Sequence, residues 1–419
     1  MHKKSGRRKA IKFFKELGPG LVTGASDDDP SGIATYSQVG AQYGFATLWM
    51  AWFTFPLMAA MQKMCGKIGV VTQQGLTSTL KNHYPKWILW TIIILSLPAI
   101  LLNIGADIEG MGAAANLIFP TIPAFLFSIL FSGTILLSII LFSYKKIAKI
   151  LKWTCTVLLV YLIVPFCTNV NWKSVIHATL QPHIQWNAAY INMMVAILGT
   201  TISPYLFFWQ TTMETEGHKK RKNVLFIDKK VWTSMRKDID FGMLFSNLVM
   251  FFIILTCGAV LYPNGITNIT TVEQAALALK PIAGNFAYAL FAIGIIGTGF
   301  LAIPVLCGSI SYMVAEALNW KKGFNKKFYQ AKPFYIVISI SMLVGLCLHG
   351  LGISPIQALI FSSILYGITA PIVILVILHI SNNKKIMSEN TNGWIANLLG
   401  MITFLIMTIA AIALIYFQF

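Results

Sequence analysis

The sequence predicts an all-α membrane protein with eleven transmembrane helices, two of which are interrupted. Apolar residues make up 56% of the 419 residues and charged residues only 11%. Apolar runs near the ~20 residues that cross a hydrocarbon core recur along the whole chain. The basic residues behind the formal net charge of +18 fall between these runs. These observations favour a lipid bilayer as the partner and exclude a nucleic-acid partner as the reason for the charge.

Each apolar run, with its weaker flanks, predicts one span. The expected spans lie near residues 17–43, 46–66, 88–112, 123–143, 149–168, 188–212, 239–262, 285–312, 334–350, 353–380 and 395–418. The expected organisation is a basic N-terminal segment at 1–16, a transmembrane core at 17–380 with halves 17–168 and 188–380, and an additional helix at 395–418.

The distribution of basic residues predicts the orientation. If the N-terminus is cytoplasmic, 30 of the 32 Lys and Arg residues fall in cytoplasmic segments, and the exceptions are Lys173 and Lys280. Cytoplasmic loops of membrane proteins carry such an excess. We therefore expect an integral protein of the plasma (inner) membrane, with a cytoplasmic N-terminus and an external C-terminus.

Two of the spans contain helix-breaking sequences at matching positions. The first span breaks at Asp29-Pro30-Ser31-Gly32, and the sixth breaks at the run from Thr200 to Pro204. Five spans separate the two prolines, and an odd number of spans inverts the topology between equivalent elements. Interrupted helices at matching places indicate a five-plus-five inverted repeat with a binding site between the halves. The last span then lies outside the repeat.

The residues at the breaks predict a cation site. Unwound turns expose backbone carbonyls, and a carboxylate added to them makes a site for a hard cation. The candidate ligands are Asp29, Ser31, Gly32, Thr200, Thr201 and Ser203. The alternative for Asp29 is a helix cap or a pair with a buried Lys. The alternative for the Ser and Thr residues is a hydrogen bond back to their own helix.

Further carboxylates in the spans indicate a cation or proton path. Asp27 and Asp28 directly precede the first ligand candidate, and we expect one to line the approach path and the other only to face water in the cavity. Asp107 and Glu109 lie in the third span, where carboxylates are costly unless they face a cavity or pair. Wetting at the external end of that span is the alternative for Glu109. Two aspartates near the start of the seventh span, Asp238 and Asp240, fit a helix-dipole role there.

At these residues the chain resembles the NRAMP family of divalent-metal transporters. The run GPGLVTGASDDDPSG, residues 18–32, is similar to the signature of that family's first span. The resemblance extends over essentially all eleven spans. It implies the inverted-repeat fold of the leucine-transporter type and transport of manganese, iron or related divalent ions, generally with protons.

The ligand motifs depart from the family pattern. The usual Asp-Pro-Gly-Asn of the first span is Asp29-Pro30-Ser31-Gly32 here, so the Asp is kept and the Asn position is Gly. The usual Met of the sixth span is replaced by Ser203. A thioether favours transition metals, whereas a hydroxyl leaves an all-oxygen site. This change favours Mg²⁺ or Mn²⁺, with small residues leaving room for a hydrated ion.

The proton-route motifs also differ. The family's His positions in the sixth span are Tyr205 and Gln210, and its Asp-x-x-Glu in the third span becomes Asp107-x-Glu109. Gln210 is therefore a candidate for the cation or proton path, and proton coupling is left open.

The predicted function is a secondary transporter of divalent metal cations, Mg²⁺ or Mn²⁺ favoured and Fe²⁺ possible, working by alternating access. The transported ion is the expected metal, and no separate cofactor is expected. The alternative is a sodium- or proton-coupled amino-acid transporter of the same fold class, although three aspartates beside the break would repel a carboxylate substrate. A channel is disfavoured by the two broken helices, and an enzyme by the absence of catalytic motifs such as HExxH.

Overall fold

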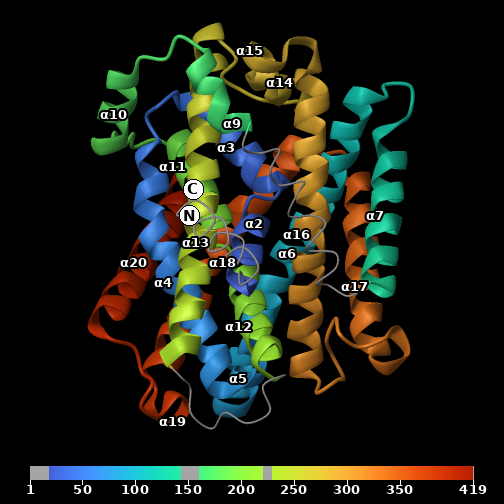
Figure 1. Ribbon diagram of the computed structural model, residues 1–419, viewed down its shortest axis with the longest axis vertical. Coiled ribbons are helices and arrows are strands. Elements are labelled where there is room, and N and C mark those ends of the chain that lie inside the picture. Colours follow the sequence, from blue (N-terminus) through green and yellow to red (C-terminus); the bar gives the residue numbers. More distant parts are fainter. Residues whose placement is uncertain (1–17, 143–159, 220–228, 419) are drawn as a thin grey trace, which may run out of the picture.

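The computed structural model describes residues 18–142, 160–219 and 229–418, and these residues form a bundle of helices joined by short connections (Figure 1). Within these ranges the regular elements are all helical, which confirms the predicted all-α class. Eight helical segments there are long and apolar enough to cross a membrane. The bundle is therefore that of a multi-span membrane protein.

The long helices follow the predicted spans closely. In chain order they are α2 (Pro19–Asp27), α3 (Pro30–Tyr43), α4 (Trp49–Thr72), α6 (Lys86–Ile118), α7 (Ala124–Leu141), α11 (Ala188–Thr201), α12 (Pro204–Lys219), α13 (Lys229–Val260), α16 (Ala287–Ala317), α17 (Lys332–Cys347), α18 (Pro355–Asn382) and α20 (Trp394–Gln418). Shorter pieces connect them: α5 (Leu76–His83), α9 (Val160–Ile163), η2 (Val164–Cys167), α10 (Trp172–Leu180), η3 (Tyr262–Asn264), α14 (Val272–Ala276), η4 (Leu277–Leu279), α15 (Lys280–Ala283), η5 (Gly284–Phe286), η6 (Phe328–Gln330), η7 (Leu348–Leu351) and α19 (Lys384–Met387).

The fifth predicted span falls largely outside the described residues. Of the range 149–168, the structure describes the part from Val160, as α9 and η2.

Both predicted breaks are present, and each has a local cause. Asp28 ends α2 with φ −83° and ψ 49°, and Asp29 is extended with φ −71° and ψ 172° before Pro30 begins α3. Ile202 ends α11 with φ −112° and ψ 52°, and α12 begins at Pro204. Proline lacks the N–H that would continue the helix, and it disfavours the helical conformation in the preceding residue.

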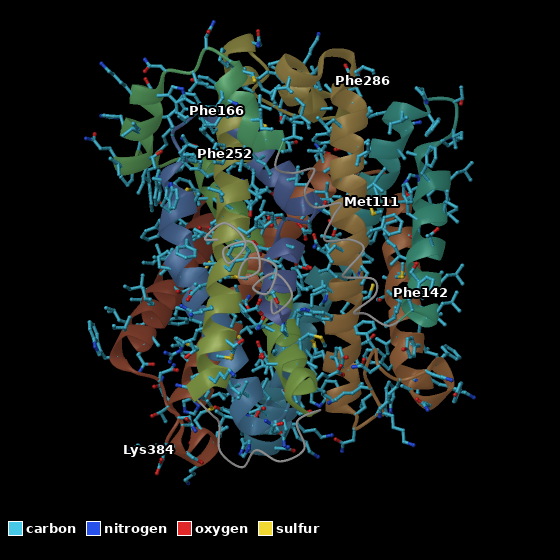
Figure 2. The ribbon with its side chains drawn as sticks, in the orientation of Figure 1. Met111, Phe142, Phe166, Phe252, Phe286 and Lys384 are labelled. Carbon is cyan, nitrogen blue, oxygen red and sulfur yellow. The ribbon has the colours of Figure 1, made fainter. Side chains whose placement is uncertain are left out.

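The broken helices lie inside the bundle. The helices α2 and α3 pack against α13, the helix α11 packs against α18, and α6 packs against both α16 and α18. By contrast, α7, α17 and α20 keep most of their apolar residues on the surface, as expected for lipid-facing helices. Figure 2 shows the same contrast for single residues: Phe142 and Phe286 lie at the outside, whereas Met111 is completely buried.

Asp238 corrects one expectation from the sequence. Because α13 already begins at Lys229, this aspartate does not open its helix. Its carboxylate instead caps the neighbouring helix α2, accepting hydrogen bonds from the backbone N–H of Gly18 at 2.8 Å and of Gly20 at 2.7 Å. The helix-dipole role is therefore exerted on α2. Asp240 forms an ion pair with Lys63 on α4.

Close backbone contact holds α2 against α13. A Cβ at Gly24 would overlap the carbonyl oxygen of Gly242, and a Cβ at Gly242 would overlap that of Gly20. Small residues allow membrane helices to approach to this distance, and the contact fixes the half-helix that leads into the first break.

This contact predicts that Gly24→Ala destabilises the protein. The added methyl group forces α2 and α13 apart, which costs about 1–3 kcal/mol. The measurement is the thermal midpoint of the purified protein, which should fall. The matched control is Gly133→Ala on α7, where a Cβ has no neighbour within 4 Å. Equal midpoints for both variants would contradict the proposed tight contact.

Candidate cation site at the two helix breaks

Asp29 lies at the first break and caps α3 with its own side chain. Its Oδ1 accepts hydrogen bonds from the Ser31 hydroxyl at 2.6 Å and from the Gly32 backbone N–H at 2.8 Å. Its Oδ2 accepts a hydrogen bond from Nδ2 of Asn103, on α6, at 2.9 Å. The residue is 1% exposed, so protein groups hold the carboxylate in place.

The cap leaves part of this carboxylate available. A carboxylate offers about four lone-pair sites, and three donors reach Asp29, two at Oδ1 and one at Oδ2. Oδ2 therefore keeps an acceptor site. Helix capping, the alternative role considered from the sequence, is thus compatible with a ligand role, because the cap fixes the orientation of the oxygen that remains.

The two breaks meet at Gly32. A Cβ at this position would lie 3.3 Å from Oγ1 of Thr200 and 3.1 Å from the carbonyl oxygen of Asp27. The first turn of α3 thus approaches the end of α11 closely, as the pairing of the breaks predicted. Any larger residue at position 32 would have to displace the Thr200 hydroxyl.

The hydroxyls of the second break are directed to different partners. Ser203 donates back to the carbonyl oxygens of Gly199 at 3.0 Å and Thr200 at 2.5 Å, so it satisfies the end of its own helix. Thr201 lies 3.3 Å from the hydroxyl of Tyr36. Of the three candidates in this break, Thr200 is the one whose hydroxyl faces the first break.

Asp107 enters the site from α6, one turn after Asn103. It is completely buried and close enough to Asp29 for the two charges to interact. Its carboxylate has the Ser31 backbone N–H as a nearby donor, and no side chain in the described part of the chain donates to it. Asn103 is itself oriented by Ser362 on α18, whose hydroxyl donates to its Oδ1 at 2.7 Å. Residues of α3, α6 and α18 therefore converge on one carboxylate.

Asp27 and Asp28 turn towards α13. The Ser246 hydroxyl on that helix lies 2.6 Å from Oδ2 of Asp27 and 3.4 Å from Oδ1 of Asp28. Both aspartates are buried. Their carboxylates therefore lie between α2 and α13, and the expectation that one lines an approach path and the other faces water in the cavity stays a prediction.

The structure places the other two path candidates with different partners. Glu109 pairs with His349 of η7, with 3.5 Å between Oε1 and Nδ1. Gln210 accepts a hydrogen bond from the Thr23 hydroxyl at 2.5 Å and donates one to Glu214 at 2.9 Å. Asp107 thus joins Asp29, whereas Glu109 belongs to the contact between α6 and η7, and Gln210 continues a buried polar chain along α12.

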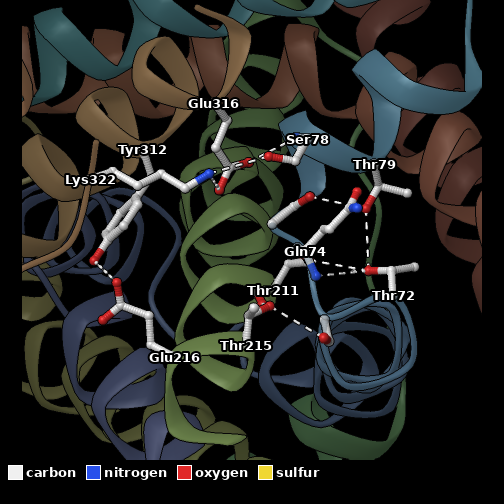
Figure 3. Close-up of polar contacts among 12 residues, drawn as sticks. Thr72, Gln74, Ser78, Thr79, Thr211, Thr215, Glu216, Tyr312, Glu316 and Lys322 are labelled. Carbon is white, nitrogen blue, oxygen red and sulfur yellow. Dashed lines mark hydrogen bonds and ion pairs between the residues drawn. The ribbon is translucent and has the colours of Figure 1, made fainter. Parts of the chain in front are cut away.

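A cavity of about 480 Å³ lies at the end of the bundle that carries α5, between α5, α12 and α16 (Figure 1). Figure 3 shows the polar contacts around it. The Tyr312 hydroxyl donates to Glu216 at 2.7 Å, and Glu316 receives both an ion pair from Lys322 at 3.0 Å and the Ser78 backbone N–H at 2.9 Å. These contacts tie the three helices together at one mouth of the bundle.

Three further residues of the site escaped the sequence prediction as site residues. Asn103 orients Asp29, Ser246 bridges the neighbouring aspartates, and the Tyr205 hydroxyl donates to the carbonyl oxygen of Ser26 in the last turn of α2 at 2.9 Å. The sequence feature that could have identified these residues is a polar side chain inside an apolar span. Many residues that only pack against other helices share that feature.

Among the described residues, the carboxylates of Asp27, Asp28, Asp29 and Asp107 have no basic partner. The ion pairs in the described part of the chain join Lys63 to Asp240, Lys322 to Glu316 and His349 to Glu109. An uncompensated buried charge costs several kcal/mol. Asp27, Asp28, Asp29 and Asp107 therefore require cations or protons. Among the described residues no group of three or more His, Cys, Asp or Glu is arranged to hold a metal, so a bound ion would also need hydroxyl and carbonyl oxygens.

Two broken helices that meet beside unpaired buried carboxylates define a secondary transporter of the broken-helix class. The chain belongs to the Nramp family, described as natural resistance-associated macrophage protein-like, which it matches over residues 20–417. This membership confirms the resemblance drawn from the first-span motif. The members of this family are transporters, not enzymes.

Similar proteins cover the chain almost completely. The divalent metal cation transporter MntH of Caldanaerobacter subterraneus subsp. tengcongensis is 25% identical over 401 residues, which are 93% of this chain and 90% of the relative. The divalent metal cation transporter MntH of Yersinia enterocolitica is 23% identical over 402 residues, which are 93% of this chain and 92% of the relative.

Solved structures share the fold at lower identity. The Eremococcus coleocola manganese transporter has a TM-score of 0.74 at 17% identity and covers 96% of this chain and 86% of its own. MhsT in complex with L-phenylalanine has a TM-score of 0.64 at 13% identity, and the match covers 96% of this chain and 98% of MhsT. These likenesses support the fold of the leucine-transporter type.

The geometry around Asp29 predicts the effect of Asn103→Ala. Loss of the amide removes the donor that orients Oδ2, and loss of such a supporting group typically weakens metal affinity 10–100-fold. Calorimetric titration of the purified protein with Mn²⁺ measures the change.

The matched control for this prediction is Asn116→Ala near the other end of α6, where the side chain bonds the Ile122 carbonyl oxygen. This control should bind Mn²⁺ as the wild type does. Unchanged affinity in the Asn103 variant would mean that the amide does not position the carboxylate.

Proposed function

We propose that this protein carries divalent metal cations across the membrane by alternating access, with the ion held between the two helix breaks. The observation that carries the proposal is the buried Asp29 carboxylate, fixed by three donors with one acceptor site left on Oδ2. Membership of the Nramp family and the similarity to transporters called divalent metal cation transporters support the same conclusion.

The ligand set favours a hard cation. Asp29 supplies carboxylate oxygen and Thr200 supplies a hydroxyl. Ser31 and Gly32 lie in the first turn of α3, and the Ser203 carbonyl accepts the Leu206 backbone N–H at 3.2 Å, so these residues would contribute oxygens only after local rearrangement. A thioether does lie at the second break, because Sδ of Met250 accepts the Thr201 hydroxyl at 3.8 Å, but that sulfur is engaged with the threonine. Oxygen ligands suit Mg²⁺ and Mn²⁺. We therefore expect these two ions to be favoured over Fe²⁺.

The charge of the site weighs against an amino-acid substrate. Asp27, Asp28 and Asp29 are buried together, and no basic residue in the described part of the chain pairs with them, so the carboxylate of an amino acid would meet three acidic groups. The likeness to MhsT concerns the fold, and the site of this chain lacks the anion-binding character that such a substrate needs.

The cavity beside α5 supplies an exit route in this proposal. Gln210 and Glu214 continue from the breaks along α12, and Glu216 on the same helix borders the cavity. Release would require the Glu216–Tyr312 contact to open, because it ties α12 to α16.

We further propose that the protein lies in the cell membrane with its N-terminus cytoplasmic. The α5 end of the bundle also carries Lys384 on α19 and the basic residues around the cavity (Figure 2). Basic residues gather on the cytoplasmic side of membrane proteins, so this end and its cavity would face the cytoplasm.

Asp29→Ala tests the transport proposal. Without the central carboxylate, uptake of Mg²⁺ and Mn²⁺ into proteoliposomes should fall by more than about 100-fold, since loss of a mere supporting group already costs 10–100-fold. The assay compares Mg²⁺, Mn²⁺ and Ca²⁺ on the same preparation. Glu273→Gln, an exposed carboxylate of α14, is the matched control and should transport normally. Equal flux in the Asp29 variant would rule out the proposed site.

Reporter fusions test the orientation. Alkaline phosphatase, which is active only outside the cytoplasm, should be active when fused after Phe419 and inactive when fused before Met1. The reverse pattern would place the α5 cavity on the external side and contradict the proposed exit route.

A further inference from the structure

The three consecutive aspartates of the first break do not share one set of partners. Asp29 accepts a hydrogen bond from Asn103 on α6, whereas Asp27 and Asp28 lie within hydrogen-bond distance of the Ser246 hydroxyl on α13. The Ser246 Oγ lies 2.6 Å from Oδ2 of Asp27 and 3.4 Å from Oδ1 of Asp28, so these two carboxylates are direct neighbours. The first break thus has two acidic centres, supported by different helices.

The second centre has unused ligand atoms. Oδ1 of Asp27 and Oδ2 of Asp28 are buried and have no hydrogen-bond partner in the described part of the chain. Relative exposures are 1% and 0%. The Ser246 oxygen donates its proton to the pair and keeps its own lone pairs. Two carboxylate oxygens and a hydroxyl oxygen therefore remain available in one dry location.

A single transported ion does not compensate the charge of the break. One divalent ion bound at Asp29 offsets two of the four negative charges of Asp27, Asp28, Asp29 and Asp107. Two adjacent buried carboxylates would then need either protons or a further cation, because an uncompensated buried charge costs several kcal/mol. A further divalent ion at the Asp27–Asp28 pair would neutralise that pair locally.

We propose that Asp27, Asp28 and Ser246 form a second divalent-cation site, distinct from the Asp29 site and supported by α13. Its ligands are oxygens, so it takes a hard cation such as Mg²⁺ or Mn²⁺. The inference rests on the proposed function for the class of ion, and it adds that the protein holds two ions, with the second on the α13 side of the break.

The test counts Mn²⁺ bound to the full chain in lipid nanodiscs by equilibrium dialysis at saturating Mn²⁺. The wild type should bind two Mn²⁺ per chain. The double variant Asp27→Asn with Asp28→Asn should bind one, and Asp29→Asn should also bind one. Glu273→Gln, which changes an exposed carboxylate far along the chain, corrects for surface binding and should retain two.

The outcomes separate this inference from the proposed function. One Mn²⁺ in both the wild type and the double variant would overturn the second site and leave the Asp29 site standing, with the pair neutralised by protons. An unchanged count in Asp29→Asn, together with a reduced count in the double variant, would instead overturn Asp29 as the ligand and keep the second site.

Ser246→Ala keeps the inference testable if the double variant fails to fold. It retains both carboxylates and removes the bridging hydroxyl, so the affinity of the second site should fall 10–100-fold while that of the first is unchanged. Thermal midpoints of variant and wild type check the fold. A Mn²⁺ titration identical to that of the wild type would overturn the assignment of Ser246 and, with it, the site.

Discussion

The burial of four carboxylates, with no basic partner among the residues that the structure describes, is the constraint on which the rest of this structure depends. Asp29 and Asp107 are both buried in the bundle, and Asp27 and Asp28 share the hydroxyl of Ser246. Such charges are tolerated where helix ends, polar groups or cations offset them. The first break provides a helix end and a polar group, because the Asp29 carboxylate lies at the start of α3 and accepts the Gly32 backbone N–H. The third means, a bound cation, would turn the same arrangement into the proposed transport site.

The scaffold around the break is built to hold it in one geometry. Asp238 caps the beginning of α2, Gly24 and Gly242 bring that half-helix against α13, and Tyr205 of the second broken span bonds the Ser26 carbonyl in the last turn of α2. The half-helix is thus fixed at its start, along its length and near its end. Movement of α2 would have to disrupt contacts with both α13 and α12, which couples the ion site to the packing of whole helices.

Much of this could be predicted from the sequence, because its signals were local. Pro30 and Pro204 break helices for reasons contained in their own peptide units, and long apolar runs define spans by length alone. The pairing of Asp29 with Asn103 and of Asp27 with Ser246 depends on contacts between residues 74 and 219 positions apart. Apolar periodicity does not specify which face of α6 or α13 meets the break. For the same reason Asp238 was expected to serve its own helix, although it serves α2.

The same electrostatic cost affects how the proposed site would release its cation. When an ion leaves the break, the carboxylates it neutralised remain in a dry environment, and their desolvation cost is no longer offset. Hydration lowers that cost, so departure of the ion favours a conformation in which water reaches Asp29. The cavity beside α5 is already roomy and polar, and between it and the break lie Gln210 and Glu214 of α12. In the proposed function, release of the ion would therefore favour opening along α12, and arrival of the next cation would favour closure.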